Sequence, residues 1–176
     1  LNVTRLASKS SWQSTGVEEQ DSLMYAQPVT DLESSSVTAV TEDTALEFTI
    51  GHGEDQKSVS LTLKADATLS EIADAINTAA DNLDESGTPY VTASVEPGND
   101  GSYIRLSATD TNSLNNNQIL VTDGPSFIAP DLLFSYQNGA TKDPVYVAVP
   151  PGTSYQETVS LINDDTNNTG VTAVLV

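Results

Sequence analysis

Alternating apolar and polar residues open the first recognisable unit of the chain. Residues 45–50 (ALEFTI) and 58–63 (SVSLTL) alternate with a period of two, which is typical of strands with one buried and one solvated face. Between them Gly51 and Gly53 flank a histidine and interrupt the strand pattern, so the chain is expected to turn there. The pattern predicts a hairpin. Its buried face would carry Phe48, Ile50, Val59, Leu61 and Leu63.

The period of the apolar residues becomes helical after residue 67. Thr68 and Glu71 have the spacing of a capping box, in which each side chain accepts a hydrogen bond from the backbone of the other residue. Apolar residues then follow at helical spacing, namely Leu69, Ile72, Ala73 and Ile76. This narrow stripe predicts a helix that covers a sheet and fades between residues 80 and 82.

Three further strands follow the predicted helix. Residues 90–95 and 103–108 are rich in strand formers, and the segment 96–101 between them is dense in turn residues. Residues 119–122 (ILVT) form a last short strand before an Asp-Gly-Pro turn. The segment 44–124 is therefore predicted to fold as β-β-α-β-β-β.

The chain contains an internal repeat with an offset of 86 residues. Residues 46–77 align with residues 132–163 without a gap. Seven aligned positions are identical: Leu46/Leu132, Phe48/Phe134, Gly53/Gly139, Val59/Val145, Glu71/Glu157, Ile76/Ile162 and Asn77/Asn163.

The pattern of the second copy agrees with that of the first. Residues 145–149 alternate, Ser154 and Glu157 repeat the capping box, and residues 171–173 match residues 91–93 after a loop that is six residues shorter. The apolar stripe is repeated by Tyr155, Val159 and Ile162, with Thr158 in place of Ile72. Agreement of caps, periods and strands predicts a structural repeat.

These elements predict an α+β protein of two small antiparallel β-rich lobes, each with one helix packed on its sheet. The first lobe is expected over residues 44–124, inserted into a discontinuous second lobe of residues 1–43 plus 125–176. Residues 1–6 and 171–176 at the two ends both have strand patterns. We therefore expect the chain to be a fragment of a longer protein, truncated where the return hairpin of the second repeat should begin.

Composition and charge exclude several classes of protein. The 176 residues include 25 Asp and Glu against 6 Lys and Arg, a net charge of -19, which disfavours binding to nucleic-acid phosphates. No apolar run approaches the roughly 20 residues that span a bilayer, so we expect no membrane association. The sequence has no cysteine and hence no disulfide or thiolate metal site.

Candidate catalytic and metal-binding residues are few. His52 could act as a general base with Ser58 or Ser60 as nucleophile and Glu54 as the orienting carboxylate, but a Gly-His-Gly turn is more typical of an exposed loop. The repeat also has an asparagine, Asn138, at the position of the histidine. We therefore expect no enzyme and no catalytic residue.

Acidic pairs are the other candidates for chemistry. The adjacent carboxylates are Glu42/Asp43, Asp84/Glu85 and Asp164/Asp165, which could be glycosidase acids or calcium ligands. Residues 165–170 have a partial calcium-loop spacing, but the bidentate glutamate of such a loop is missing. Residues 99–101 and 110–112 are better interpreted as turns. We expect no metal ion and no cofactor.

Aromatic residues could form a platform for carbohydrate, but on strands they more often pack in the core or at an interface. The residues concerned are Trp12, Tyr25, Tyr90, Tyr103, Phe127, Phe134 and Tyr136. Core packing is the favoured interpretation.

The repeat resembles the flagellin IN motif, a module of bacterial flagellar axial proteins. The first copy resembles it in residues 75–77 (AIN), 91–93 (VTA) and 105–106 (RL), and the second in residues 161–165 (LINDD) and 170–173 (GVTA). The sequence departs from the motif at Pro150-Pro151 and in the long loop of residues 81–89.

The opening residues 3–9 (VTRLASK) resemble the segment that enters the outer domains of the flagellar filament cap protein family, hook-associated protein 2. This resemblance implies an extracellular, ring-like oligomer at the distal tip of the flagellum, beneath which flagellin subunits fold and add. The β-rich outer domains of that family form a plate, and the helical terminal regions that contact the filament are missing from this sequence. The implied partners are further copies of the protein and flagellin.

Three alternatives remain open from the sequence. The same lobes would suit a surface adhesin or carbohydrate-binding module that binds host or surface glycans. They would also suit the outer domain of a hook–filament junction protein or of a flagellin. A hydrolase with paired carboxylates would need two carboxyl groups roughly 5 to 10 Å apart in a cleft.

Overall fold

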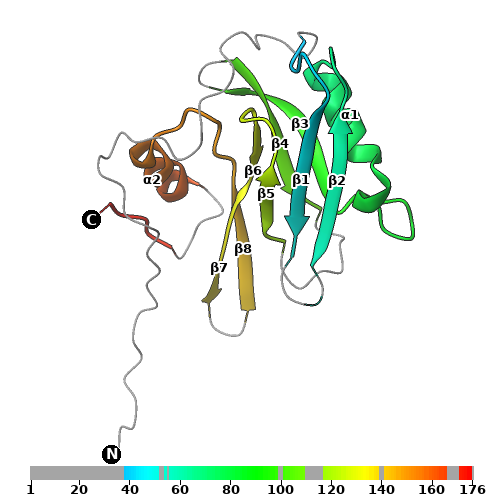
Figure 1. Ribbon diagram of the computed structural model, residues 1–176. Coiled ribbons are helices and arrows are strands. Elements are labelled where there is room, and N and C mark those ends of the chain that lie inside the picture. Colours follow the sequence, from blue (N-terminus) through cyan, green and yellow to red (C-terminus); the bar gives the residue numbers. More distant parts are fainter. Residues whose placement is uncertain are drawn as a thin grey trace, which may run out of the picture.

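The computed structural model describes residues 38–51, 54, 56–98, 101–109, 117–138, 141–165 and 171–175. These residues form eight strands and two helices, and Figure 1 shows how the elements are arranged. The strands are β1 (Thr44–Ile50), β2 (Lys57–Leu63), β3 (Val91–Gly98), β4 (Gly101–Ala108), β5 (Ile119–Asp123), β6 (Ile128–Pro130), β7 (Leu132–Asn138) and β8 (Thr141–Val147). The helices are α1 (Leu69–Thr78) and α2 (Tyr155–Asp164), and a 3-10 turn covers Ala80–Asn82.

The described strands form three small sheets. Their strand orders are β2-β1-β5, β3-β4-β6 and β7-β8. All neighbouring strands are antiparallel except β4 and β6, which run parallel. The predicted α+β class, with small antiparallel sheets and two helices, is confirmed.

The hairpin β1–β2 has the predicted buried face. Phe48 lies opposite Val59, and Leu46 lies opposite Leu61. Phe48, Val59 and Leu46 are almost completely buried, whereas Leu61 is half-buried. The chain leaves β1 through Gly51, whose φ of 81° suits a residue without a Cβ.

Helix α1 covers the core with the predicted apolar stripe. Its buried side chains are Leu69, Ile72, Ala73 and Ile76. The helix lies mainly against β3, with smaller contacts to β2 and β4. It ends at Thr78, slightly earlier than predicted, and the 3-10 turn takes the place of its expected last turn.

A buried asparagine joins the end of α1 to the start of β3. The Nδ2 atom of Asn82 donates to the carbonyl oxygens of Ile76 at 2.9 Å and Val91 at 2.7 Å. Its Oδ1 atom accepts a hydrogen bond from the Val91 amide at 3.0 Å. Because all three bonds lie in the interior, the loop after α1 is held by polar contacts with no water needed.

The core is shared by α1 and the two three-stranded sheets. The hairpin β3–β4 is paired along its whole length, from Val91 opposite Ala108 to Gly98 opposite Gly101. Further core side chains come from β3, β4, β5, the turn before β6 and β6 itself: Val91, Ala93, Ile104, Leu106, Ile119, Phe127 and Ile128. The elements from β1 to β6 therefore bury one continuous apolar cluster.

The expected division of the chain into residues 44–124 and residues 1–43 plus 125–176 stays a prediction. Residues on both sides of the 44–124 segment contact its core, since Val40 and Phe127 are buried in the same cluster. Residues 1–37 lie outside the described part of the chain.

Candidate functional site

The second hairpin repeats the first in its strand pairing. Leu132 lies opposite Val147 in β7–β8, and the equivalent residues Leu46 and Leu61 lie opposite each other in β1–β2. The offset of 86 residues found in the sequence therefore relates both members of each pair. A slip of one residue would turn every side chain to the other face, so an identical register places equivalent residues on equivalent faces.

The turn between hairpin and helix is also repeated. Asp66 has a φ of 64°, and the equivalent Gly152 has a φ of 83°. One residue further on, the amide of Ala67 donates to the carbonyl of Lys64 at 3.1 Å. The equivalent amide of Thr153 donates to the carbonyl of Pro150 at 3.2 Å. In both repeats the chain thus enters its helix through a turn that contains one left-handed residue.

Both predicted capping boxes are present. The Thr68 amide donates to a carboxylate oxygen of Glu71 at 2.9 Å, and the Glu71 amide donates to the Thr68 hydroxyl at 3.3 Å. In the second copy the Ser154 amide donates to Glu157 at 2.8 Å, and the Glu157 amide donates to the Ser154 hydroxyl at 3.2 Å. The pKa of each glutamate lies below its usual value. The hydrogen bond from the cap backbone is the larger cause, and the hydrogen bond from the cap hydroxyl is the smaller one.

An asparagine in each helix holds the chain where it returns past the helix. Asn77 donates to the carbonyl of Ala93 at 2.9 Å and accepts from its amide at 2.7 Å. Asn163 donates to the carbonyl of Ala173 at 3.0 Å and accepts from its amide at 2.9 Å. These two asparagines are among the seven identities of the sequence repeat. The pairing, the turn, the caps and this contact together confirm that the sequence repeat is a structural repeat.

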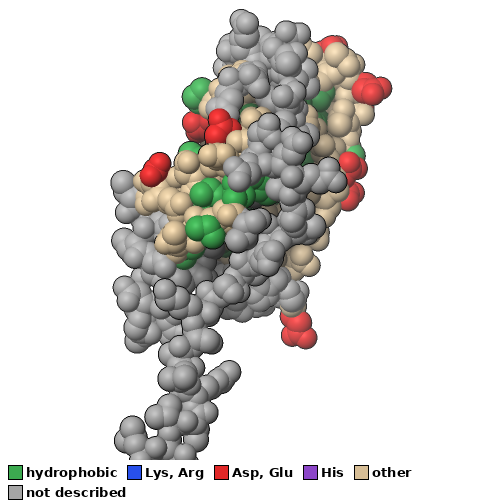
Figure 2. Space-filling view, turned by 90° about the vertical axis from the view of Figure 1, so that its left-hand side faces the viewer, with side chains coloured by type: hydrophobic (Ala, Val, Ile, Leu, Met, Phe, Trp, Pro, Cys, Tyr) green, Lys and Arg blue, Asp and Glu red, His purple; other side chains and the backbone are tan. Residues whose placement is uncertain are grey.

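The two helices differ in how far their apolar faces are buried. In α2 the buried residue is Thr158, at the position of Ile72, whereas Tyr155, Val159 and Ile162 are half-buried. The side chain of Leu161 is also 38% exposed. Figure 2 looks at the side of the molecule that carries α2, where apolar side chains reach the surface between acidic ones.

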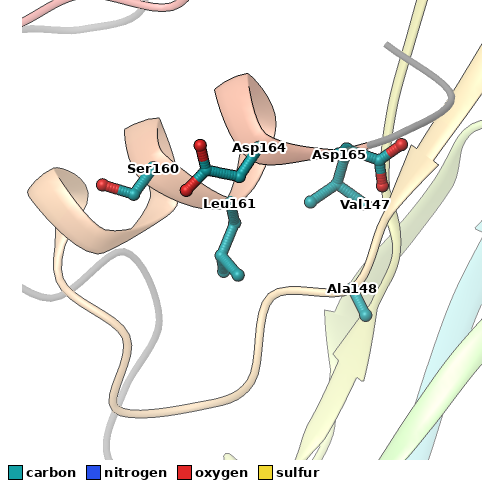
Figure 3. A pocket seen from close by; sticks show the side chains of 6 residues that line it. All are labelled: Val147, Ala148, Ser160, Leu161, Asp164 and Asp165. Carbon is teal, nitrogen blue, oxygen red and sulfur yellow. The ribbon is translucent and has the colours of Figure 1, made fainter.

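A hollow of about 350 Å³ lies between α2 and the end of β8. Figure 3 shows the side chain of Leu161 pointing from the helix into it. The lining residues are Val147, Ala148, Ser160, Leu161, Asp164 and Asp165. A hollow of about 290 Å³ occupies a similar place between β2 and α1, where Ala75 stands at the position of Leu161. Leu161 thus adds a larger apolar side chain to the second hollow than Ala75 adds to the first.

Several carboxylates hold local structure. Asp43 forms an ion pair with Lys64 at 2.8 Å and accepts the Ala65 amide at 2.9 Å, and these contacts lower its pKa. Asp84 accepts hydrogen bonds from the hydroxyl and amide of Ser86 and from the Thr88 amide, which lower its pKa as well. Both residues belong to acidic pairs named as candidate ligands, and both instead stabilise turns.

The structure describes only some of the other candidate residues from the sequence. His52 lies outside the described residues, while Ser58 and Ser60 are exposed on β2 and Glu54 is exposed before it. Residues 166–170 of the partial calcium loop also lie outside the described part. Among the residues that the structure describes, no group of three or more His, Cys, Asp or Glu is placed to hold a metal ion.

The aromatic side chains that the structure describes are buried or half-buried. Tyr103 and Phe127 are 3% and 1% exposed, as expected for core packing. Tyr90 is half-buried, and the ammonium group of Lys57 lies 5.9 Å from its ring centroid. Trp12 and Tyr25 lie outside the described residues, as do the side chains of Phe134 and Tyr136.

Two structural contacts were not predicted from the sequence. The helical pattern predicts Asn82 only as the fading end of a helix, and no pattern singles out Asp131, which directly precedes the second repeat. Asp131 accepts hydrogen bonds from Arg105 and Ser107. The available signal for this contact was a charged residue directly before an apolar strand. Its partner, Arg105, lies 26 residues away in the sequence, so no local pattern connects the two.

Comparison with known families gives a match that falls on the first repeat. Residues 46–112 match the model of the flagellin hook IN motif, a segment that runs from β1 to just beyond β4. The motif indicates a flagellar structural role and association with flagellar subunits. Comparisons with curated proteins and with solved structures gave no match. Within the described residues no helix is long and apolar enough to cross a membrane.

Proposed function

We propose that this chain is the outer, plate-forming region of a flagellar filament cap, a non-enzymatic part that promotes flagellin assembly at the distal tip. It would act outside the cell as part of a ring-like oligomer of the full-length protein, with flagellin subunits as its partners. The observation that carries the proposal is the presence of two equivalent units, the first of which matches the flagellin hook IN motif.

The contacts within each unit support a structural role. The capping boxes, the asparagine contacts and the two left-handed turns all fix backbone, and they recur in both copies. A surface scaffold needs a fixed backbone more than it needs reactive groups. The carboxylates of Asp43 and Asp84 are likewise engaged in turns.

The acidity of the chain suits a repeated assembly in water. A net charge of -19 gives neighbouring copies a mutual repulsion that limits unspecific aggregation. Specific contacts between copies would then depend on apolar or hydrogen-bonded surfaces, and the half-buried face of α2 is one such surface.

Immunogold labelling of intact flagella tests the proposal. Antibody raised against this chain would be applied to cells that make the full-length protein, with cells lacking its gene as the control. Gold confined to the distal ends of filaments is the expected result. Gold at the hook–filament junction, along the filament or away from flagella would contradict the cap assignment, and each pattern would favour one of the other axial or adhesive roles.

A second measurement addresses the oligomer. Light scattering of the full-length protein should give a mass several times that of one chain. A full-length protein that stays monomeric at all concentrations would contradict the ring-like assembly.

A further inference from the structure

Asp131 lies at the junction of the two repeats, between β6 and β7. Its carboxylate accepts hydrogen bonds from Arg105 Nε at 2.7 Å, Arg105 Nη2 at 2.9 Å and Ser107 Oγ at 2.9 Å. Its amide donates to the carbonyl of Leu106 at 2.9 Å. The residue just before the second repeat is thus bound to β4 of the first unit through both its side chain and its backbone.

The carboxylate of Asp131 is desolvated, since its side chain is 3% exposed. A buried carboxylate is unfavourable unless it is paired and hydrogen-bonded, and the two parallel bonds from one guanidinium are the strongest pairing that proteins offer. The hydrogen bonds to Asp131 raise the pKa of Arg105, so the guanidinium stays charged. Separation of the junction from β4 would therefore leave an unpaired charge in a poorly solvated place.

A second polar contact joins the units at another point. Nδ2 of Asn117, just before β5, donates to the hydroxyl of Tyr146 in β8 at 2.8 Å. The residues are 29 positions apart, on either side of the junction. Rotation about the junction would break this bond.

The two units also approach each other closely at a third point. A Cβ atom placed on Gly98, at the end of β3, would lie 3.3 Å from Tyr103 Cδ1 and 3.7 Å from the Cβ of Pro150, after β8. The Tyr103 side chain beside it is almost completely buried, and this burial raises the pKa of the phenol. The end of the β3–β4 hairpin thus lies close to the turn that follows β8.

We infer that these three contacts hold the two repeats as one rigid body. The Arg105–Asp131 pair contributes most, because it fixes the junction between the repeats. A single contact would leave an axis of rotation, whereas three contacts at different points of the two units leave none. Both repeats would then move together in any assembly, and the angle between them would be a fixed property of the chain. This inference does not depend on the proposed function.

Spin-label distance measurements between the units test this inference. The sequence has no cysteine, so Ser58→Cys on β2 and Ser160→Cys on α2 would each place one label at an exposed position. The full 176-residue chain with these labels should give one narrow distance distribution. Asp131→Ala combined with Tyr146→Phe should broaden that distribution about twofold.

Two variants control for general loss of folding. Asp74→Ala removes an exposed carboxylate on α1 and should leave the distribution narrow. Tyr146→Phe alone removes one hydroxyl and no packing, so it should fold and broaden the distribution slightly. A broad distribution in the unmodified chain would contradict the rigid body, and so would an unchanged distribution in a folded Asp131→Ala, Tyr146→Phe variant.

Discussion

The side chain of Asn163 binds both backbone polar groups of Ala173. It donates to the carbonyl oxygen at 3.0 Å and accepts from the amide at 2.9 Å. Asn77 holds Ala93 in the same way, although the chain between them is six residues longer. The position at which the chain returns past the helix is therefore independent of loop length. A side chain with one donor and one acceptor group can hold a returning segment that is not a strand, and residues 171–175, where a strand pattern was noted, are not a strand.

The two asparagine contacts should differ in strength. The Asn77 contact is partly buried, so Asn77→Ala should lower the free energy of unfolding by about 1 to 3 kcal/mol. The Asn163 contact is exposed, so water replaces it and Asn163→Ala should cost about 1 kcal/mol or less. Urea unfolding of both variants checks this order. An equal or larger loss at Asn163 would show that burial does not set the difference.

The left-handed turn residues give a matched pair of backbone variants. Asp66 occupies a conformation that costs a side-chain residue about 1 kcal/mol, so Asp66→Gly should be neutral or slightly stabilising. Gly152→Ala introduces a Cβ at a φ of 83° and should destabilise by about 1 to 2 kcal/mol. Thermal unfolding measures both, and a stabilised Gly152→Ala variant would argue against the left-handed turn.

Asn82 should be among the most sensitive positions of the first repeat. In Asn82→Asp the carboxylate can accept from the Val91 amide, but it loses both donated bonds and faces the carbonyl oxygens of Ile76 and Val91. The expected loss is about 3 kcal/mol or more, because a charge is left unpaired in the interior. Denaturant unfolding gives the value.

The capping boxes make part of the stability depend on pH. Because the folded pKa of Glu71 lies below its ordinary value of 4.5, the ionised side chain stabilises the fold above that value. This contribution is lost as the pH falls through the lowered folded pKa. The wild type should therefore exceed Glu71→Gln in melting temperature near neutral pH, and the difference should shrink below about pH 4.5. Glu157→Gln should behave alike, and a difference that grows in acid would contradict both.

Local patterns in the sequence predicted most elements of the first repeat. The strands near residues 45–50 and 58–63, the capping box and the apolar stripe of α1 are all short-range signals, and each is confirmed. The parallel pairing of β4 with β6 was not predicted, because Ile104 and Ile128 meet through contacts between distant segments. The Arg105–Asp131 pair was not predicted for the same reason, since its two residues are far apart in the sequence.

The sequence by itself determined that one strand–turn–strand–helix unit occurs twice, since periodicity, caps and turn residues act within a few positions of the chain. The tertiary structure decided how far each copy is buried. Ile72 in α1 is enclosed by neighbouring sheets, whereas the equivalent helix α2 keeps Leu161 partly exposed beside β8. Burial depends on which distant surfaces come together, and no local pattern of residues specifies that.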